Sequence, residues 1–452
     1  MSQALASGAR RLPAIPAARI AEAGLLLAVG LMFVQRTPDL PVVREAMTLS
    51  ELVFLGSAGI WLLMVATVRA PVRIYSAGLL VPFLLYVFAG LLSLYCSPYD
   101  TRDVDGIREL LARMYLMAFM LTLASYATTV QTYQRVLLAW GVAAAVIVTL
   151  LAVHLAGLGG TALVDFQGRF IGLFRNPNAA GGALAGTVLC FLPVAFTRGR
   201  ADSLTLFRTF ARLTLPGLLV AVYLSDSQGS YLAVLLGLAV WPLIRVSRNW
   251  GPSIALLVMV VAVPLIVGVT QIESLGHVIE QVLELIGYET SGTKFGARVD
   301  MIESRLRAIL MNPITGVGLS KAILSHDPLS AIAAHGTHFT ILGIALETGL
   351  LGLAAVGLVF VTYLGIIRKN ASLPLGAYPI WRSLNEGLTM AFIGFMVFGL
   401  THDVQTNRVM WLMATMGVSF RPAFESEAVD APPQTQRPSR LAWVLSHGRA
   451  RS

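Results

Sequence analysis

The sequence predicts an all-α, polytopic membrane protein with about 12 transmembrane helices, and three observations support this fold class. Hydrophobic residues make up 56% of the 452 positions and charged residues only 13%, whereas soluble domains carry about 25% charge. Apolar runs long enough to cross a bilayer recur along the whole chain. Short arginine clusters separate these runs in a regular pattern. A chain of this kind needs lipid around much of its surface.

The apolar runs divide the chain into membrane and non-membrane parts. We expect the spans at residues 20–34, 49–68, 74–95, 107–126, 136–158, 179–196, 211–224, 231–244, 252–269, 339–367, 385–401 and 408–420. The first run lacks a small-residue cleavage site after it, so we interpret it as a retained span. The membrane domain then comprises residues 20–269 and 339–420. Residues 1–19 and 421–452 are tails, the second of them disordered because it is rich in Pro and Arg.

The charge pattern orients the helices. Positive residues favour cytoplasmic loops, and every second connection is basic: Arg69 and Arg73; Arg135; Arg198, Arg200, Arg208 and Arg212; Arg245 and Arg248; Arg368, Lys369 and Arg382. The other short connections are neutral or acidic, as at Asp100, Asp103 and Asp105. Both termini are therefore expected in the cytoplasm. The net charge of +9 is spread over these loops, so it does not indicate a nucleic-acid partner.

Two extracytoplasmic segments break this charge rule. Residues 159–178 hold Arg169 and Arg175, and the long loop of residues 270–338 holds several basic residues. Long loops are translocated largely regardless of charge, which accounts for the second segment better than for the first. Helical spacing of apolar residues predicts two helices in the long loop, at residues 272–286 and 297–310. Asn312-Pro313 then ends the second helix, and a glycine turn follows it.

The second of these loop helices carries residues that suit a phosphate ligand. Its apolar stripe consists of Val299, Ile302, Leu306 and Ile309. Arg298 and Arg305 stand seven residues apart, on nearly one face of the helix. A guanidinium binds phosphate oxygens with paired donors and keeps its charge. Pairing of Arg305 with Glu303, or with a lipid phosphate, is the open alternative.

Four blocks stand in order within or beside these outer segments. They are Gly168-Arg169-Phe170-Ile171-Gly172-Leu173-Phe174-Arg175-Asn176-Pro177-Asn178; Ser225-Asp226-Ser227-Gln228-Gly229-Ser230; Ala297-Arg298 with Asn312-Pro313-Ile314-Thr315-Gly316-Val317-Gly318; and His338 with Glu347-Thr348-Gly349-Leu350-Leu351-Gly352. Together they resemble the motif blocks of the O-antigen ligase and O-antigen polymerase superfamily of bacterial inner-membrane proteins. The resemblance covers about residues 160–355.

This resemblance implies a reaction and its site residues. Proteins of the superfamily transfer glycan from undecaprenyl pyrophosphate to an acceptor hydroxyl at the periplasmic face of the bacterial inner membrane, in O-antigen or exopolysaccharide synthesis. Pyrophosphate binding is implied for four arginines: Arg169, Arg298, Arg175 and Arg305. Of these, Arg175 is the alternative to Arg169. His338 matches the family's histidine by its distance to Glu347 and is the implied catalytic base.

Four further residues are expected to support the site: His335, Glu347, Asn178 and Asp403. His335 also fits a plain turn, because it lies beside a glycine. Glu347 equally fits a helix-packing role, since nine residues place it ~13 Å deeper than His338 along a helix. Phe339 replaces the Asn that follows the family's histidine, which removes a polar group beside the base. No metal-ligand pattern is evident, and no cofactor is expected.

The sequence leaves three functions open. The first is a glycan polymerase and the second a ligase that moves finished glycan to lipid A-core; they share the donor and differ in the acceptor. The third is a twelve-helix secondary transporter of a small solute. Against transport, no charged pair is evident at the midplane of the membrane and no inverted repeat is visible. We therefore expect a metal-independent, inverting glycosyltransferase, embedded in the lipid bilayer, that moves glycan from a lipid-pyrophosphate donor to a glycan or lipid A-core acceptor at the outer face of the membrane.

Overall fold

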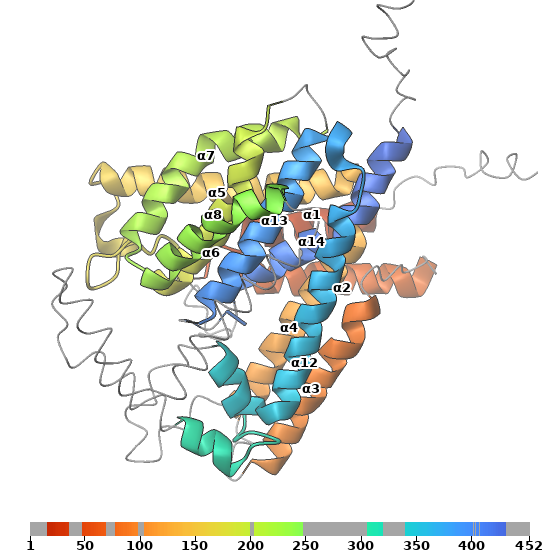
Figure 1. Cartoon of the computed structure of the whole chain (residues 1–452), viewed down its shortest axis with the longest axis vertical. Helices are drawn as coiled ribbons and strands as arrows, with labels where there is room; N and C mark the ends of the chain where they lie inside the picture. Colours follow the sequence, from red (N-terminus) through yellow and green to blue (C-terminus); the bar gives the residue numbers. More distant parts are fainter. Residues whose placement is uncertain are drawn as a thin grey trace, which may run out of the picture.

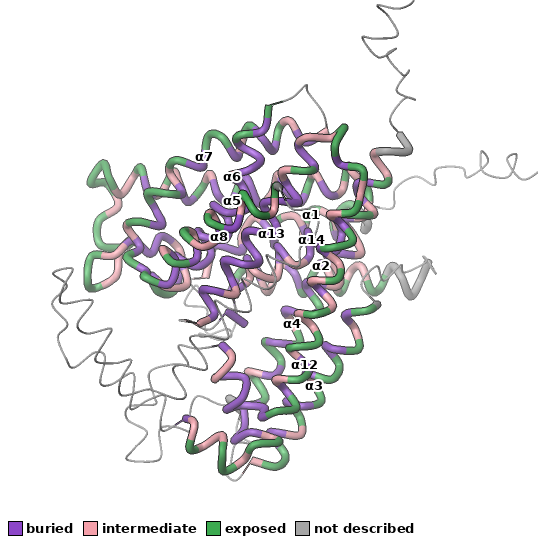
Figure 2. The backbone as a smooth tube through the Cα atoms, in the orientation of Figure 1, coloured by how far each residue is buried: buried purple, intermediate pink, exposed green. Residues whose placement is uncertain are grey.

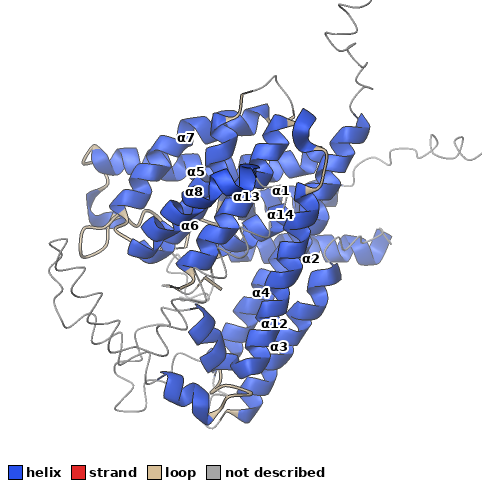
Figure 3. Ribbon diagram, in the orientation of Figure 1, coloured by secondary structure: helices blue, strands red, loops and turns tan. Residues whose placement is uncertain are grey.

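The computed structural model describes residues 16–35, 48–68, 77–97, 104–198, 203–246, 305–319, 340–400, 402, 404–405 and 407–430. Its α-helices are α1 (Pro16–Gly30), α2 (Leu49–Val68), α3 (Ala77–Cys96), α4 (Val104–Tyr126), α5 (Val130–Leu155), α6 (Pro177–Phe196), α7 (Thr205–Leu224), α8 (Gln228–Val246), α12 (Thr340–Ala371), α13 (Pro379–Phe398) and α14 (Arg408–Asp430). Two short 3-10 helices are η1 (Gly160–Leu163) and η4 (Leu375–Ala377). Figure 3 shows helices and loops throughout these residues, which confirms the all-α prediction.

The helices follow the hydropathy of the sequence. Each expected span overlaps one of them, except residues 252–269, which lie outside the described residues. In the described part of the chain, six helices are long and apolar enough to cross a membrane: α3, α5, α6, α7, α8 and α12. The chain is therefore a polytopic membrane protein.

Two helices differ from the expected spans. Helix α12 joins two helical parts across a break at Gly349, where one continuous span was expected. Helix α14 continues through Asp430, so residues 421–430 are helical and not part of a disordered tail. Phe424 explains this extension, because its ring packs against Tyr378 and Trp381 with centroids 5.1 and 5.7 Å apart.

The helices form a packed body and an arm (Figure 1). In the body, α6 lies against α7, α8 and α13. Of its most apolar 18-residue stretch, 89% is buried. Its glycines allow this close approach: a Cβ on Gly182 or Gly186 would lie within 2.5 Å of a phenylalanine ring on α13. Figure 2 shows the resulting continuous burial along α6 and α13.

The arm consists of α3, α4 and α12. Helix α12 lies along α3, and α14 connects the arm to the body by contacting α4, α12 and α13. Only 22% of the most apolar 18-residue stretch of α12 is buried, as expected of a helix that faces lipid on most of its surface. Buried apolar side chains of α3, α4 and α12 form one cluster with residues of α13 and α14, and this cluster holds the arm to the body.

Candidate functional site

The break in α12 at Gly349 is the feature around which the candidate site is built. Gly349 has φ 64° and ψ −160°, a conformation that L side chains rarely adopt. A Cβ at this position would lie 2.3 Å from the carbonyl oxygen of Ile314, so only glycine fits. The break leaves main-chain N–H and C=O groups on both sides without helical partners. Within a membrane these groups need partners from elsewhere in the protein.

Residues 312–318, which we call the docked segment, supply those partners. Four main-chain hydrogen bonds join the segment to α12: Val317 N to Leu346 O at 2.8 Å, Gly318 N to Glu347 O at 3.3 Å, Leu350 N to Pro313 O at 2.8 Å, and Leu351 N to Ile314 O at 3.3 Å. Gly316 has φ 72°, and a Cβ there would lie 2.6 Å from the main chain of α12. The Asn-Pro-x-x-Gly-x-Gly and Glu-x-Gly-x-x-Gly blocks are therefore two halves of one structural unit.

Helix α3 fixes both halves of this unit. The hydroxyl of Ser93 donates to the carbonyl of Glu347, and the hydroxyl of Ser97 donates to the carbonyl of Val317 at 2.5 Å. Ser93 lies in the last turn of α3, and Ser97 directly follows the last residue of this helix, Cys96. Three separate stretches of the chain thus meet at the break.

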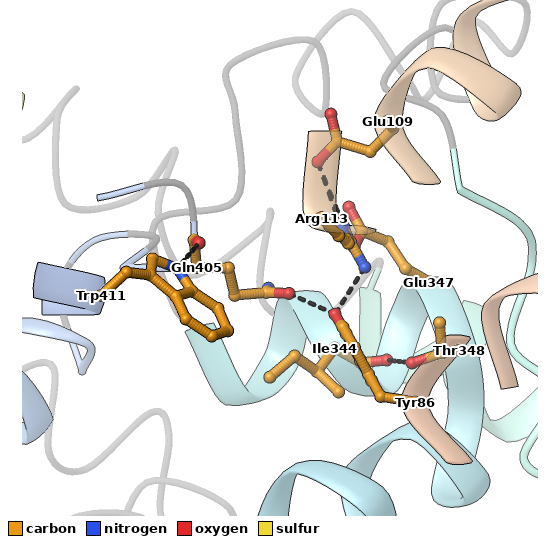
Figure 4. Close-up of polar contacts among 8 residues, drawn as sticks. All are labelled: Tyr86, Glu109, Arg113, Ile344, Glu347, Thr348, Gln405 and Trp411. Atoms are coloured by element: carbon orange, nitrogen blue, oxygen red, sulfur yellow. Dashed lines mark hydrogen bonds and ion pairs between the residues drawn. The ribbon is translucent and has the colours of Figure 1, made fainter. Parts of the chain in front are cut away.

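The side chain of Glu347 joins a buried charge cluster, which we define as Tyr86, Glu109, Arg113, Glu347 and Gln405 (Figure 4). Nη2 of Arg113, on α4, forms an ion pair with Glu347 and lies 3.3 Å from Oε1 of Glu109. Nη1 of Arg113 donates to the hydroxyl of Tyr86 at 2.6 Å. That hydroxyl donates in turn to Oε1 of Gln405. The cluster therefore connects α3, α4, α12 and the chain just before α14.

The charge of Glu347 also acts on a second guanidinium, that of Arg305. Arg305 begins the described helix of residues 305–311 and is 1% exposed. Burial lowers the pKa of its guanidinium, although the negative charge of Glu347 raises it in part. Arginine stays protonated under these conditions because its ordinary pKa is so high. The expected apolar stripe is not the most buried face of this helix, since Leu306 and Ile309 are only half-buried.

The loop between α5 and α6, residues 156–176, holds Arg169 differently. Asp165 accepts hydrogen bonds at 2.9 Å from the main-chain N–H groups of Gln167 and Arg169 and from Nε of Arg169. Nη2 of Arg169 lies 2.7 Å from the same carboxylate. Burial alone would raise the pKa of Asp165, but these hydrogen bonds and the charge of Arg169 hold it below its ordinary value. Arg169 thus closes a local turn.

The end of the same loop begins α6. Arg175 is exposed, and its Nε donates to the carbonyl of Gln35 at 3.3 Å. Asn176 caps the helix by accepting a hydrogen bond from the amide of Ala179 at 2.8 Å, and a proline at the first helical position favours this start. Asn178 is half-buried in the first turn. The Asn-Pro-Asn part of the first block therefore forms the N-terminus of α6.

The turn between α7 and α8 lies beside this loop, because the amide of Phe170 donates to the carbonyl of Leu224 at 2.8 Å. Three serines of the turn are buried against α6: Ser225, Ser227 and Ser230. A Cβ on Gly181 of α6 would lie within 2.8 Å of each of them. The second block is therefore a close packing contact between the turn and α6.

The structure brings only some of the expected site residues together. Glu347 lies beside the break and its charge acts on Arg305, whereas Arg169 and Arg175 lie in the α5–α6 loop, in a different part of the molecule (Figure 1). Four expected residues lie outside the described part of the chain, so their placement stays a prediction: Arg298, His335, His338 and Asp403. Among the described residues, no three His, Cys, Asp or Glu side chains are grouped as metal ligands.

Arg113, Tyr86 and Gln405 were not expected in the site. A charged side chain inside an apolar run is itself a signal of function, and Arg113 offered that signal. Its partner Glu347 lies 234 residues further along the chain, a separation that no local pattern spans. The sequence therefore did not reveal this buried pair, whose members lie in the expected spans 107–126 and 339–367.

An apolar cavity begins at the charge cluster. Tyr86, Arg113 and Gln405 line it at one place, and aliphatic, methionine and aromatic side chains from α3, α4, α12, α13 and α14 line most of the rest. A second cavity lies between α12 and α13 and shares Ile344, Val356 and Phe360 with the first. Polar groups thus border a long apolar space.

Residues 213–357 match the protein-family model described as O-antigen ligase. The matched range begins within α7 and ends within α12, so it contains the α7–α8 turn, the docked segment and the break, but not the first motif block. A comparison with curated proteins found no match. The chain carries an O-antigen ligase family domain, which confirms its relationship to the O-antigen ligase and polymerase superfamily.

Proposed function

We propose that the protein transfers a glycan from an undecaprenyl-pyrophosphate-linked donor to an acceptor hydroxyl, with its active site at the periplasmic face of the bacterial inner membrane. The family match over residues 213–357 is the observation that carries this proposal. It coincides with the broken helix, where the buried Arg305 stands beside a charged cluster. In this arrangement both chain termini lie in the cytoplasm, as the charge pattern predicts.

A lipid-linked pyrophosphate combines an anionic head with a long apolar tail. Arg305, together with Arg298 from the motif, offers paired donors to the phosphate oxygens. The two apolar cavities along α12 suit an isoprenoid chain, because their walls are almost entirely apolar side chains. The charge cluster borders the first cavity. Head and tail of one donor can therefore be accommodated side by side.

The transfer follows from this placement. The acceptor oxygen attacks the anomeric carbon of the donor sugar, and the bond from that carbon to the pyrophosphate oxygen breaks. Its electron pair leaves with undecaprenyl pyrophosphate, while His338 accepts the hydroxyl proton as general base. The arginines stabilise the charge that grows on the leaving group, which is usually the largest catalytic contribution. Attack opposite the leaving group inverts the anomeric configuration, and these groups suffice without a metal ion.

A pair of arginines on one short helix tests this proposal. Arg305 is buried, whereas Arg307, two residues further along, is exposed. We expect Arg305→Ala to reduce long surface glycan to below about a tenth of the wild-type amount, since it removes charge from the leaving-group site, and Arg307→Ala to leave it unchanged. Arg298→Ala and His338→Ala should act like Arg305→Ala. Surface glycan is measured on gels from the native host; normal chain length and attachment in all of these variants would contradict the proposal.

The same gels separate the two acceptors. Loss of long chains with single repeats still attached indicates a polymerase. Accumulation of undecaprenyl-linked glycan, with no attachment to lipid A-core, indicates a ligase. The family domain supports both equally.

The buried Arg113–Glu347 pair is the one observation that favours transport instead, because charged pairs inside spans mark transport pathways in many membrane proteins. Purified protein in liposomes distinguishes the two functions. Turnover of lipid-linked glycan without any ion or solute gradient supports transfer. Solute uptake without turnover would support transport.

A further inference from the structure

Two exposed arginines lie next to each other where helix α8 ends beside the start of helix α13. Arg245 stands in the last turn of α8, and Arg382 is the fourth residue of α13. Nη2 of Arg382 donates to the main-chain carbonyl of Arg245 at 3.2 Å. The two helices also pack against each other, so both basic side chains are held at one place on the surface.

A buried carboxylate organises this place. Glu386, one turn further along α13, is 6% exposed. Its Oε1 accepts a hydrogen bond from Nε of Arg382 at 3.1 Å, and its Oε2 accepts one from Nε1 of Trp241 at 3.0 Å. The guanidinium carbon of Arg245 lies over the Trp241 ring, 5.9 Å from its centre, within the range of cation–π attraction. One carboxylate therefore orients an arginine and also the ring on which the second arginine rests.

This arrangement leaves positive charge directed outward. Glu386 supplies one negative charge, whereas Arg245 and Arg382 supply two positive ones. Among the described residues, none accepts a hydrogen bond from the guanidinium of Arg245. The Trp241 ring covers a face of that guanidinium, and its N–H groups project from the edges, where oxygen acceptors bind. The side chain of Arg382 is 49% exposed, so it too can be reached from outside.

The surroundings of the two arginines indicate a lipid ligand. Helix α8 is long and apolar enough to cross a membrane, and its Leu235 and Leu243 are exposed. The charge pattern predicts that this end of the helices lies at the cytoplasmic face, and tryptophan is enriched at headgroup level. Anionic phospholipids give the cytoplasmic leaflet its negative surface, and basic pockets between helices bind their headgroups. A molecule with a phosphate and acyl chains matches both the arginines and the leucines.

We propose that Arg245 and Arg382 bind the phosphodiester of an anionic phospholipid, with the Trp241 ring as the floor of the headgroup site. The phosphate oxygens accept hydrogen bonds from the outward N–H groups of the two guanidiniums, and the acyl chains lie along the exposed leucines of α8. Glu386 is buried and positions the site from below. This binding does not depend on the proposed glycan transfer.

Native mass spectrometry of the purified full-length protein measures the affinity for single phospholipid molecules. Phosphatidylglycerol is the anionic probe, and phosphatidylcholine with the same acyl chains is the zwitterionic comparison. We expect wild type to bind phosphatidylglycerol at least about 5-fold more tightly, and Arg245→Gln and Arg382→Gln each to weaken that binding about 5-fold, the contribution of one basic residue near an anionic lipid surface. Phosphatidylcholine binding should not change.

Arg421→Gln is the matched control on α14. Arg421 also forms an ion pair with a glutamate four residues later, Glu425, and its side chain is 48% exposed, close to the value for Arg382. The side chain of Glu425 is 54% exposed, against 7% for Glu386, so this pair lacks the buried carboxylate. Phosphatidylglycerol binding in Arg421→Gln should stay within about 2-fold of wild type.

Three results would overturn the proposal. The first is unchanged phosphatidylglycerol binding in both Arg245→Gln and Arg382→Gln. The second is an equal loss in Arg421→Gln, because any exposed arginine would then contribute as much. The third is displacement of the lipid by inorganic phosphate in large excess, which would assign the site to a free anion. If Arg382→Gln does not fold, Arg245→Gln decides alone, since Arg245 is exposed.

Discussion

The α5–α6 loop and the helix of residues 305–311 each carry an arginine on which the charge of a carboxylate acts, but by different means. In the loop, Asp165 and Arg169 are four residues apart, and the arginine side chain remains 25% exposed. At the break, Arg305 is 1% exposed, and the carboxylate that acts on it belongs to a helix that also pairs with α4. The first arrangement is local, whereas the second depends on four distant stretches of the chain.

This difference bears on the roles of the two arginines. A local ion pair that also receives two main-chain hydrogen bonds is sufficient to explain Arg169 as a turn residue. Arg305 is buried far more completely, and burying a guanidinium is costly unless the surroundings are arranged for it. We therefore expect changes at the break to alter function and changes in the loop to alter mainly local stability.

The largest effect is expected from Gly349→Ala. The new Cβ would overlap the carbonyl of Ile314 at 2.3 Å and require a left-handed conformation, so the docked segment must leave α12. We expect a loss of about 3 kcal/mol or more in the free energy of unfolding, and loss of pyrophosphate binding. Thermal unfolding in detergent and calorimetry measure these quantities.

Gly357→Ala is the control on the same helix, because nothing lies within 4 Å of a Cβ there. It should leave both quantities unchanged or raise stability slightly, since alanine favours helix over glycine. Equal losses in the two variants would show that the break at Gly349 is not specifically required.

A medium effect is expected in the loop. Asp165→Asn removes the charge that holds Arg169 and weakens hydrogen bonds at 2.9 Å, so protection of residues 156–176 from hydrogen exchange should fall by about 1–3 kcal/mol. Arg169→Ala should do the same. Pyrophosphate binding should stay within about 2-fold of wild type in both variants if Arg169 is a turn residue. A 10-fold loss in Arg169→Ala but not in Asp165→Asn would instead make Arg169 a donor ligand.

The loop should also respond to acid. The pKa of Asp165 is held below its ordinary value in the folded protein, so its contribution to stability is complete at neutral pH. The contribution begins to fall as the pH drops through about 4, the ordinary value of an aspartate, and disappears below the folded pKa. Hydrogen exchange of the loop across this range should show the decline in wild type. Asp165→Asn should show none, and an equal decline in that variant would assign the effect to another group.

The smallest effect is expected from Ser93→Ala. This change removes one buried side-chain hydrogen bond to the carbonyl of Glu347. In the wild type that carbonyl also accepts a hydrogen bond from the amide of Gly318, so it keeps one partner in the variant. A loss of about 1 kcal/mol in the free energy of unfolding is expected. Ser97→Ala, at the partly exposed neighbouring contact, should cost less. A larger effect at position 97 would show that the docked segment, and not α12, depends on α3.

Hydropathy located the helices because lipid imposes length and apolarity on each span separately. The same reasoning could not locate the break, since an isolated glycine in an apolar run is compatible with a continuous helix. It placed Arg305 in a candidate site, but it expected the apolar stripe to be the buried face of this helix. In the structure the helix buries Arg305 more completely than Leu306 or Ile309. The pairing of Arg113 with Glu347 depends on how α4 and α12 pack together. The spacing of apolar residues within either helix does not predict that packing.

Four hydrogen bonds between the docked segment and α12 are made by the main chain. The two glycine motifs consequently describe a backbone shape, and they say nothing by themselves about chemistry. A relative that had lost its activity could retain both motifs, because its membrane fold would still need the broken helix to be filled. Active and inactive members of such a group would then differ at the charged side chains around the broken helix. Sorting sequences by residues 113, 305 and 347 would separate the two kinds, whereas sorting them by the glycines would not.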